Sequence, residues 1–585
     1  MRSVLRRASP LAAVAIVLAA AAPAIEIWQV QGSGASSPYA GQTVTTTANV
    51  VTAVGPAGFF IATPPERSDH DPATSDGIYV YRGSAPGVTA GDVVDVTGTV
   101  SEYHGMTEIS ATAVSVVGTG AALPAPVELD GDHPPGSRPQ AGAELESLEG
   151  MLVHAANGTV TGPSDRRGAI AFVARSGRAF REPGIPWPGV NGLPLWDGNP
   201  EVLFAQLAAF GAPSASVPAG ARVDEIAGPL AEYDGAYEVW PTSFHFTGEP
   251  SARPVRERRA GEFTVATQNL YQLFDDVADG GEKVVSPDEY ARRLAKHSLL
   301  IRDVLRAPDV LAVQEAESLK VLEDLAARLH DDDPQLSYTA YLLPGNDPSG
   351  IDVGVLARNT VTVAEVAQAG KDETFVYGGS TYLTHDRPPL VVRAEFSGGQ
   401  APFPFTLVAV HMRSLSGIDG DNGGFVRAKR AEQARSLARL VQSLQAGDPA
   451  AHVVVAGDFN AFEFTDGWVD VLGQVTGTPD PLGAMIPASP LVAPPLTDWT
   501  RSLPAGERYS FVESGNAQAL DHILTSQALA GHVSGAEYAR ANADAPAALA
   551  AEAATPLRAA DHDGMALFVS TAPLHRPRRL IHGAR

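Results

Sequence analysis

The chain has 585 residues, which is too long for one ordinary hydrophobic core, so two or three domains are expected. Hydrophobic residues make up 44% and charged residues 19%, as in globular proteins, and the lack of cysteine excludes disulfides, thiolate zinc sites and cysteine nucleophiles. The formal net charge of -25 excludes binding of nucleic acid through an overall positive field, so a phosphate ligand needs local arginines or a bridging cation.

The first residues predict a secretory signal peptide over residues 1–24. Arg2, Arg6 and Arg7 precede an apolar run, which extends from Leu11 to Ala22. The small residues Ala22-Pro23-Ala24 then suit cleavage. The run is too short to span a bilayer and no later segment replaces it, so we expect no stable membrane insertion. The preference for Arg over Lys and the many Ala residues favour a bacterial protein, and the predicted signal peptide implies export to the periplasm or the extracellular medium.

Two β-rich domains are expected next, over residues 25–125 and 126–250. In the first, short alternating strands separated by Gly and Pro predict a small barrel of the oligonucleotide/oligosaccharide-binding (OB) type. Its expected strands are Gln42–Val51, Gly58–Ala62, Ile78–Tyr81, Asp92–Val100 and Thr107–Val114. The second block runs from about Leu148 to about Phe246. Residues 251–262 are rich in arginine and predict a linker.

From Phe263 onward, strands alternate with helices, which predicts a mixed α/β sandwich. Ser286 precedes Pro287 and lies three residues before Glu289, a pattern typical of a helix start with a capping box. Further amphipathic helices are expected over 317–329 and 429–444. The α/β region is predicted to extend over residues 263–572, followed by a basic tail over 573–585.

Within the α/β region, apolar strands repeatedly begin or end at a polar residue. The clearest case is Val453–Ala456, a β-branched run followed by Gly457-Asp458-Phe459-Asn460. The other polar strand ends are Gln268-Asn269, Gln314-Glu315, His411, Asp521-His522 and Asp561-His562-Asp563. Each of these alone is also typical of a turn or a solvated edge. If antiparallel neighbours bring them to one edge of a sheet, the set favours divalent-metal hydrolysis of a phosphate ester.

These motifs, in this order and spacing, resemble the endonuclease/exonuclease/phosphatase superfamily. The chain is most similar to bacterial secreted nucleases with β domains before the catalytic domain. That closer likeness rests on Gly91-Asp92-Val93-Val94-Asp95-Val96-Thr97-Gly98, Glu149-Gly150-Met151-Leu152-Val153 and Tyr509-Ser510-Phe511-Val512. The resemblance implies a four-layer α/β sandwich as the catalytic domain over 263–572, preceded by all-β, OB-like domains.

The resemblance also implies a role for each candidate residue. The expected metal ligands are Asn269, Glu315 and Asp561. The expected catalytic residues are His411, Asp458, Asn460, Asp521 and His562. The expected substrate contacts are Arg387, Arg413 and Ser510. The metal is expected to be Mg²⁺, with Mn²⁺ or Ca²⁺ as alternatives, because hard cations prefer carboxylate oxygen.

The chemistry of each side chain fits the role that the resemblance implies. Asp458 would position or deprotonate the attacking water, and Asn460 would hold a phosphate oxygen. Asp521 gives His562 a carboxylate partner that fixes its tautomer and favours the imidazolium. Arg387 suits a phosphate as a fork of donors, although a surface arginine before a strand has the same sequence. Arg413 takes a place where relatives often carry lysine.

The sequence therefore predicts a secreted, metal-dependent nuclease of low sequence specificity, acting as a monomer on DNA or RNA and leaving 5′-phosphate ends. A phospholipase C, sphingomyelinase or phosphatase built on the same catalytic set is an alternative, because shared motifs do not distinguish substrates. A non-catalytic protein that binds matrix or nucleic acid is a third possibility.

Overall fold

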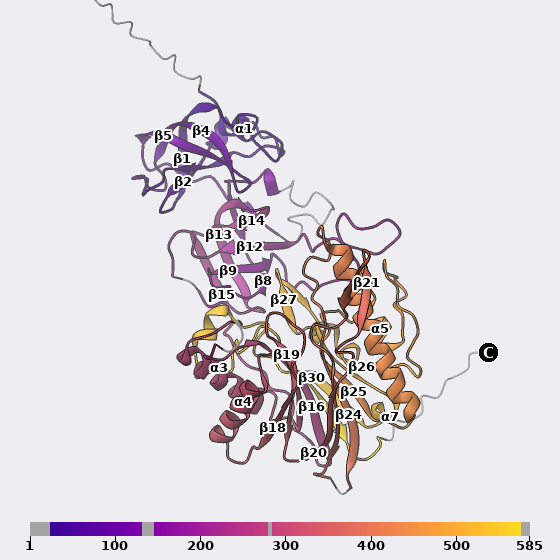
Figure 1. Cartoon of the computed structure of the whole chain (residues 1–585). Coiled ribbons are helices and arrows are strands. Elements are labelled where there is room, and N and C mark those ends of the chain that lie inside the picture. The colour runs from indigo at the N-terminus through magenta and orange to yellow at the C-terminus, as the bar shows by residue number, and fades with distance from the viewer. Residues whose placement is uncertain (1–23, 131–144, 214, 279–282, 400, 575–585) are drawn as a thin grey trace, which may run out of the picture. The chain divides into compact units, whose positions relative to one another are not determined.

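The computed structural model describes residues 24–130, 145–213, 215–278, 283–399 and 401–574 (Figure 1). The predicted signal peptide lies outside the described residues except for Ala24, and the basic tail lies outside them from residue 575 on. The described chain divides into two compact units. The smaller unit contains the chain up to Ala125 with Glu146–Leu152 and Glu232–Gly235, and the larger unit contains the remainder.

The smaller unit is a closed β-barrel with the strand order β1-β2-β3-β5-β4. The strands are β1 Thr43–Val54, β2 Gly58–Ala62, β3 Gly77–Tyr81, β4 Val93–Tyr103 and β5 Met106–Gly118. Side chains of β4 alternate between buried and half-buried, as expected where one face of a strand lines a barrel. The short helix α1, Ile27–Gln31, adds Ile27 and Val30 to the barrel core. The predicted all-β character of this region is confirmed.

The larger unit begins with a second all-β block, in which the sheet order is β14-β12-β9-β8-β13-β7-β6 and β15 pairs with β13. These strands are β6 Val127–Glu128, β7 Leu152–Ala155, β8 Gly158–Gly162, β9 Ala169–Val173, β12 Val202–Gln206, β13 Arg222–Tyr233, β14 Ala236–Val239 and β15 Ser243–Thr247. A small parallel pair lies between β9 and β12 in the chain and consists of β10 Ile185–Pro186 and β11 Leu195–Trp196.

Two sheets form the α/β region. The β16 sheet has the order β18-β19-β17-β16-β31-β30. Its strands are β16 Glu262–Leu273, β17 Val310–Ala316, β18 Tyr338–Leu342, β19 Asp352–Arg358, β30 Val533–Tyr538 and β31 Met565–Ser570. The β25 sheet has the order β20-β23-β24-β25-β29-β26. Its strands are β20 Val361–Gln368, β23 Leu390–Phe396, β24 Phe403–His411, β25 Val453–Asp458, β26 Thr497–Asp498 and β29 Asp521–Thr525.

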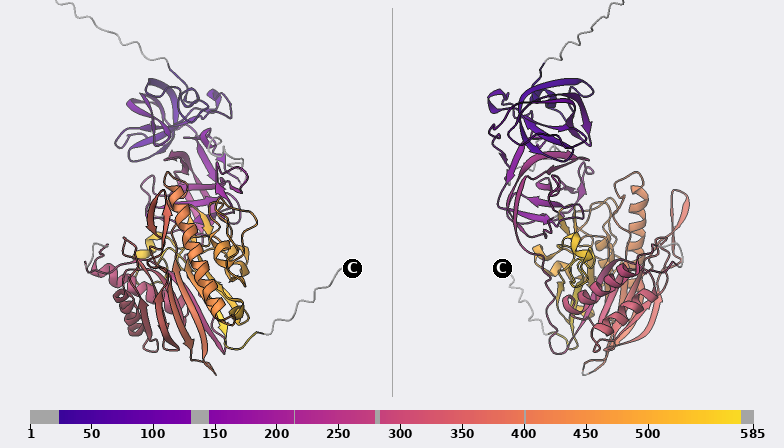
Figure 2. Two further views of the ribbon diagram at one scale, coloured as in Figure 1. Left: turned by 45° about the vertical axis from the view of Figure 1, so that its right-hand side comes forward. Right: turned by 90° about the vertical axis from the view of Figure 1, so that its left-hand side faces the viewer.

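Helices cover the outer face of each sheet. On the β16 sheet lie α3 Pro287–Leu299, its π-helical extension η2 Leu300–Val304, and α4 Leu319–Asp332. On the β25 sheet lie α5 Gly423–Gly447 and α6 Val471–Thr476. Figure 1 shows α3 and α4 on one side of the sheets and α5 on the other, and Figure 2 shows α5, in orange, running along its sheet. The predicted four-layer α/β sandwich is confirmed.

Separate hydrophobic cores hold these layers together. The inner faces of the two sheets share one core, in which Phe263 and Val265 of the β16 sheet meet Leu407 and Val454 of the β25 sheet. The outer faces pack against the helices in two further cores. Since strands buried on both faces must be apolar throughout, runs such as that of β25 carry their polar residues only at the ends.

The remaining elements are short. They are the hairpins β21 Thr374–Tyr377 with β22 Ser380–Leu383 and β27 Phe511–Glu513 with β28 Asn516–Gln518, the helix α7 Gln527–Ala530, and the 3-10 turns η1 Pro65–Arg67, η3 Thr500–Ser502, η4 Ala505–Glu507 and η5 Ala547–Ala551. Residues 251–262, predicted as a linker, are packed onto the α/β region, because Val255 is buried in the helix-covered core of the β16 sheet. Within the described ranges, no helix is both long enough and apolar enough to span a bilayer.

The start of α3 follows the sequence pattern closely. The hydroxyl of Ser286 accepts a hydrogen bond from the Glu289 amide at 3.2 Å, and Pro287 occupies the first helical position. Both features satisfy or avoid the unpaired amide groups of a first helical turn. The helix faces the end of β16, where Arg293 of α3 donates to backbone carbonyls.

Candidate active site

Three neighbouring strands of the β25 sheet place polar side chains at one level of the sheet. The parallel pairing of β24 with β25 aligns His411 with Asp458, and the antiparallel pairing of β25 with β29 aligns Asp458 with Asp521. Because β29 runs in the opposite direction, its first residue meets the last residue of β25. Strand ends and strand starts therefore meet at one edge, as the sequence pattern predicted.

The β16 sheet contributes Asn269 and Glu315 at the corresponding edge. Asn269 of β16 pairs in register with Gln314 of β17, so Glu315 follows directly beside it. Glu315 has a positive φ of 61°, and the pairing of β17 with β19 is irregular at this residue. Such an irregularity turns a side chain away from its regular direction, and here it turns Glu315 toward Asn269.

The two sheets meet at Asn269. Its amide Nδ2 donates to Glu315 Oε1 at 2.9 Å and to Asp458 Oδ2 at 3.2 Å, while its Oδ1 accepts from the Tyr271 amide at 2.8 Å. Glu315 Oε2 accepts a further bond from the Gln272 amide at 2.8 Å. The site is thus held together by an amide that bridges carboxylates from both sheets.

The carboxylates of the site fit a divalent cation. Glu315, His411 and Asp458 each offer a ligand atom, and these atoms lie within 4.8 Å of one another. Burial, with Asp561 adding repulsion, raises the pKa of Glu315, and burial together with Asp521 raises the pKa of Asp458. Asp561 Oδ1 is buried and has no hydrogen-bond partner among the described residues. Crowded carboxylates and an unpaired buried oxygen are what a hard cation would stabilise.

His562 forms a close polar contact with Asp521. Its Nδ1 lies 2.7 Å from Asp521 Oδ2, and Asp521 is fully buried. Although burial opposes a charge, the Asp521 and Asp561 carboxylates raise the pKa of His562 well above its ordinary value. The ring of Phe511 lies against the imidazole with 4.8 Å between centroids. His562 is therefore an oriented cation whose Nε2 makes no hydrogen bond within the described part of the chain.

His411 differs from His562 in charge. Its Nε2 lies 3.6 Å from Asp458 Oδ2 and 4.0 Å from Glu315 Oε1. Burial first, and then the nearby Arg387 and His562 cations, lower the pKa of His411 well below its ordinary value. A neutral imidazole has a single N–H to donate. The site therefore contains one neutral and one positively charged histidine.

Asn460 is directed toward the backbone. It has a positive φ of 47°, and its amide N donates to Asp458 Oδ1 at 2.8 Å. Its side-chain Nδ2 donates to the carbonyl of Met412 at 3.1 Å. The Gly457-Asp458-Phe459-Asn460 turn thus holds one oxygen of Asp458 in place and leaves the other facing Asn269 and His411.

The predicted substrate contacts are placed differently from the expectation. Arg387 is almost buried, forms an ion pair with Asp347, and donates to the carbonyls of His411 at 3.4 Å and Met412 at 3.2 Å. It therefore fixes the end of β24 rather than facing solvent. Arg413 donates to Ser414 Oγ at 2.6 Å and to the Ser416 carbonyl at 3.3 Å, and it is partly exposed beside the site.

The prediction for Ser510 is corrected by the structure. Ser510 is fully buried, and its Oγ accepts backbone amides from Leu520 at 3.0 Å and Asp521 at 3.2 Å. Its hydroxyl therefore holds the start of β29 and has no access to a phosphate. The physical reason is that the two amides at a strand start need an acceptor once they are buried.

Three contributors to the site were missed by the sequence patterns. Phe511 covers His562, the Gln272 amide holds Glu315, and Arg293 of α3 donates to the carbonyls of Leu270 and Gln272 at 3.2 and 2.6 Å. Arg293 also bonds to the carbonyl of Tyr271. No local sequence signal marks a backbone amide that will hold a carboxylate. Phe511 lies in the Tyr509-Ser510-Phe511-Val512 motif, but the motif did not indicate that its ring packs on His562.

Two protein-family models match parts of the chain. The family model described as the Endonuclease/Exonuclease/phosphatase family matches residues 266–562, half of the chain. A second model, described as Domain of unknown function (DUF8508), matches residues 138–250. No curated protein matches the chain.

Solved structures are also similar. TDP2 from C. elegans has 14% identity and a TM-score of 0.34, covering 54% of this chain and 77% of that chain. The human Nocturnin catalytic domain with bound sulfate anion has 15% identity and a TM-score of 0.34, covering 54% and 97%. An endonuclease/exonuclease/phosphatase from Bacteroides vulgatus has 15% identity and a TM-score of 0.34, covering 53% and 98%.

Proposed function

The chain belongs to the Endonuclease/Exonuclease/phosphatase family of hydrolases, and from this premise we propose that it is a secreted, divalent-metal-dependent nuclease. It hydrolyses the phosphodiester backbone of DNA, or of RNA, without strong sequence preference and leaves 5′-phosphate ends. One observation carries the proposal. The charged pair of His562 with buried Asp521 stands beside a carboxylate cluster that fits a divalent cation. Such a pair suits a reaction that builds negative charge on a phosphate.

The hydrogen bonds of each residue suggest its role in the proposed reaction. His562, held by Asp521 through Nδ1, donates from its other nitrogen to a phosphate oxygen as charge develops there. Asp458 has one oxygen held by the Asn460 amide, and its second oxygen accepts the proton of the attacking water. Asn269 donates to both carboxylates and keeps them close together. His411, being neutral, has one N–H, and its Nε2 faces Asp458 Oδ2 at 3.6 Å, so we assign it to orienting Asp458.

Glu315 and Asp561 are the proposed ligands of Mg²⁺, with Mn²⁺ and Ca²⁺ as alternatives. When bound, the cation would neutralise charge on the phosphate that is attacked. Asn269 presents its Nδ2 donor to the acids, so we assign it to the surroundings of the cation rather than to direct coordination. The buried, unpaired Asp561 Oδ1 and the crowded Glu315 support this assignment.

The all-β parts are proposed to help hold the nucleic-acid strand. The barrel order β1-β2-β3-β5-β4 supports an OB-type assignment, a fold that binds extended strands in many proteins. Export rests on residues 1–24 alone, and a monomer remains our expectation. The proposed location is the periplasm or the extracellular medium.

The test is a gel assay of circular plasmid, linear duplex, single-stranded DNA and RNA, each with Mg²⁺, Mn²⁺, Ca²⁺ or EDTA. We expect the wild type to convert circular plasmid to linear forms only with a divalent cation. His562→Ala should lower turnover about 100-fold or more, the scale lost with one good transition-state donor. Glu315→Gln should raise the cation concentration needed for half-maximal activity.

His330→Ala is the matched control, because this exposed histidine on α4 bonds only to the nearby Leu336 carbonyl at 2.9 Å. Its activity should equal that of the wild type. Release of a headgroup from sphingomyelin or phosphate from 4-nitrophenyl phosphate, with every nucleic acid left intact, would assign the site to a lipid or monoester substrate instead. Cleavage that persists unchanged in EDTA would rule out the metal.

A further inference from the structure

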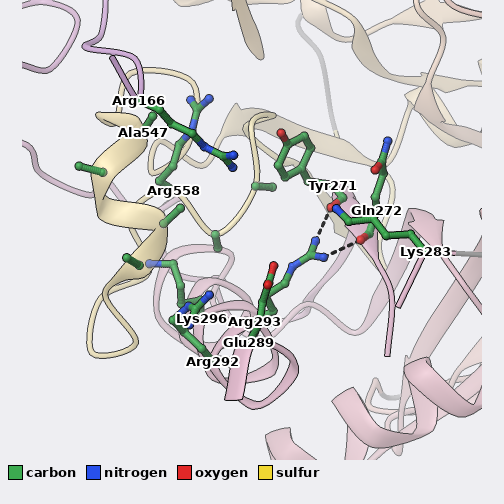
Figure 3. A pocket seen from close by; sticks show the side chains of 15 residues that line it. Arg166, Tyr271, Gln272, Lys283, Glu289, Arg292, Arg293, Lys296, Ala547 and Arg558 are labelled. Carbon is green, nitrogen blue, oxygen red and sulfur yellow. Dashed lines mark hydrogen bonds between the residues drawn. The ribbon is translucent and has the colours of Figure 1, made fainter. Parts of the chain in front are cut away.

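A cavity of about 440 Å³ lies beside the candidate active site, and its walls are rich in positive charge (Figure 3). Its cationic lining residues are Arg166, Lys283, Arg292, Arg293, Lys296 and Arg558. Glu289 is the one acidic residue among the described lining residues. In a chain with a formal net charge of -25, so dense a group of cations needs a physical explanation.

Two of these cations serve the fold. Lys296 Nζ lies within 2.7 to 3.0 Å of the carbonyls of Leu549, Glu552, Thr555 and Leu557, and so it fixes the segment that forms one wall. Arg293 donates to the backbone carbonyls of Tyr271 and Gln272 at the end of β16, as Figure 3 shows. Their charges are therefore used inside the protein.

Three other arginines face the cavity without an acidic partner. Arg166 comes from the second all-β block, Arg292 from α3, and Arg558 from the segment before β31. Within the described residues, none of the three forms an ion pair with a carboxylate, and Arg292 Nε is buried without a hydrogen-bond partner. Arg558 donates a hydrogen bond from one nitrogen to the Asn542 carbonyl at 3.0 Å. Guanidinium groups without a carboxylate partner are suited to a phosphate, because each can bind it through two parallel hydrogen bonds.

The cavity and the active site share a stretch of backbone. Tyr271 and Gln272 line the cavity, and both have a positive φ, 53° and 52°. Their amides donate to Asn269 Oδ1 and to Glu315 Oε2, each at 2.8 Å. Tyr271 is 44% exposed, so its ring is available as a stacking surface where the cavity borders the active site.

We propose that this cavity is a second phosphate subsite, which binds a non-scissile phosphate of a nucleic-acid strand through Arg166, Arg292 and Arg558. A base next to the cleaved bond stacks on Tyr271 as the strand passes from the active site into the cavity. The inference rests on the proposed nuclease function and narrows it, because a subsite of this kind selects polynucleotides over small phosphate esters. It also gives the second all-β block, the source of Arg166, a part in substrate binding.

The test compares a fluorescent oligonucleotide with bis(4-nitrophenyl) phosphate, a diester too small to reach the cavity. Arg166→Ala and Arg292→Ala should each raise KM for the oligonucleotide about tenfold, the scale of a charge-assisted hydrogen bond. Each should also make the slope of log KM against log salt shallower by about one unit, since one phosphate contact is lost. The change is expected for the oligonucleotide and not for the small diester.

Arg167→Ala is the matched control, because this arginine adjoins Arg166 in sequence but pairs with Asp165 at 3.4 Å. It should leave both KM and the salt slope as in the wild type. Equal losses on both substrates in Arg166→Ala, or an unchanged KM and salt slope for the oligonucleotide, would overturn the subsite. A wild type that hydrolyses neither substrate with any divalent cation would instead overturn the nuclease function itself.

Discussion

The two histidines of the candidate active site differ in charge because different groups surround them. His562 bonds to the buried Asp521 carboxylate, which outweighs the effect of burial and keeps the imidazole protonated. His411 is equally buried but has the Arg387 cation near it, so its neutral form is favoured. In the proposed reaction, this difference suits His562 to stabilising negative charge and His411 to orienting a carboxylate.

Glu149, a buried acid in the smaller unit, leads to a prediction about how stability depends on pH. Its side chain is only 1% exposed, and Oε1 accepts bonds from Gln31 Nε2 at 3.2 Å and from the Thr107 amide at 3.0 Å. Oε2 has no partner among the described residues. Burial first, and then the Glu146 and Glu232 carboxylates, raise the pKa of Glu149 from 4.5 to about 9.

Because the folded state holds this proton more tightly than the unfolded chain, folding loses stability as pH rises from about 4.5 to about 9. Glu149→Gln removes the charge and keeps an acceptor at the position of Oε1. We expect the melting temperature of the variant, relative to wild type, to increase steadily between pH 5 and pH 9. Thermal melts at closely spaced pH values measure this difference.

The control for this series is Glu66→Gln, which removes an exposed carboxylate from the same unit. Its difference from wild type should not change with pH in the same manner. A Glu149→Gln difference that stays constant from pH 5 to pH 9 would mean that the pKa of Glu149 in the folded protein is close to its value in the unfolded chain, and would contradict the prediction.

At the scale of elements, strand pairing and backbone irregularity together build the site. Register brings His411, Asp458 and Asp521 to one level of the β25 sheet. Left-handed backbone at Glu315 and Asn460 then turns these two residues out of regular strand geometry. Such conformations cost free energy in non-glycine residues and persist where surrounding contacts hold them.

Gly457 provides a direct test of this arrangement. A Cβ at this position would lie 2.0 Å from the carbonyl oxygen of Val410, and the residue has a positive φ of 154°. Gly457→Ala therefore forces β24 and β25 apart next to His411 and Asp458. We expect a loss of several kcal/mol in the free energy of unfolding, as for other severe overpacking, together with loss of activity. Chemical denaturation monitored by tryptophan fluorescence measures the first quantity.

Gly447→Ala is the matched control, since this glycine ends α5 and a Cβ there meets nothing within 4 Å. Alanine in a helix is about 0.8–1 kcal/mol more favourable than glycine, so the control should be neutral or slightly stabilising. Equal stability of the two variants would show that the β24 and β25 backbones separate without cost.

At the scale of the whole molecule, the division into two compact units predicts separable unfolding. The candidate metal cluster of Glu315, His411 and Asp458 lies in the larger unit, and Glu149 lies in the smaller one. A ligand that binds only the folded state raises the melting temperature of the part that binds it. Mg²⁺ or Mn²⁺ should therefore raise one calorimetric transition by a few degrees and leave the other unchanged.

Two variants assign these transitions. Glu315→Gln should abolish the shift caused by the cation, whereas Glu149→Gln should move only the transition that the cation leaves in place. A single transition that responds to both variants would contradict the division into independent units.

The acidic composition of the whole chain affects how a negatively charged ligand approaches it. A chain with a net charge of -25 repels a polyanion at a distance, so the proposed binding of nucleic acid would depend on local cations such as Arg166, Arg292 and Arg558. These three come from distant parts of the chain, and no run of sequence marks them as a group. Only folding places them around one cavity.

The sequence alone determined the features that depend on neighbouring residues. The apolar run before Asp458 and the Ser286 cap of α3 are local patterns, and both appear in the structure as expected. The polar ends of strands likewise pointed to one edge, because strand direction and pairing leave few alternatives.

Tertiary structure decided which polar residues face the site and which are occupied elsewhere. The Ser510 hydroxyl accepts hydrogen bonds from backbone amides at the start of β29. Arg387 forms an ion pair with Asp347 and donates to carbonyls at the end of β24. The charge of His562 depends on Asp521, which only sheet pairing brings within 2.7 Å. Burial and partners arise from segments far apart in the chain, so they cannot be read from local sequence.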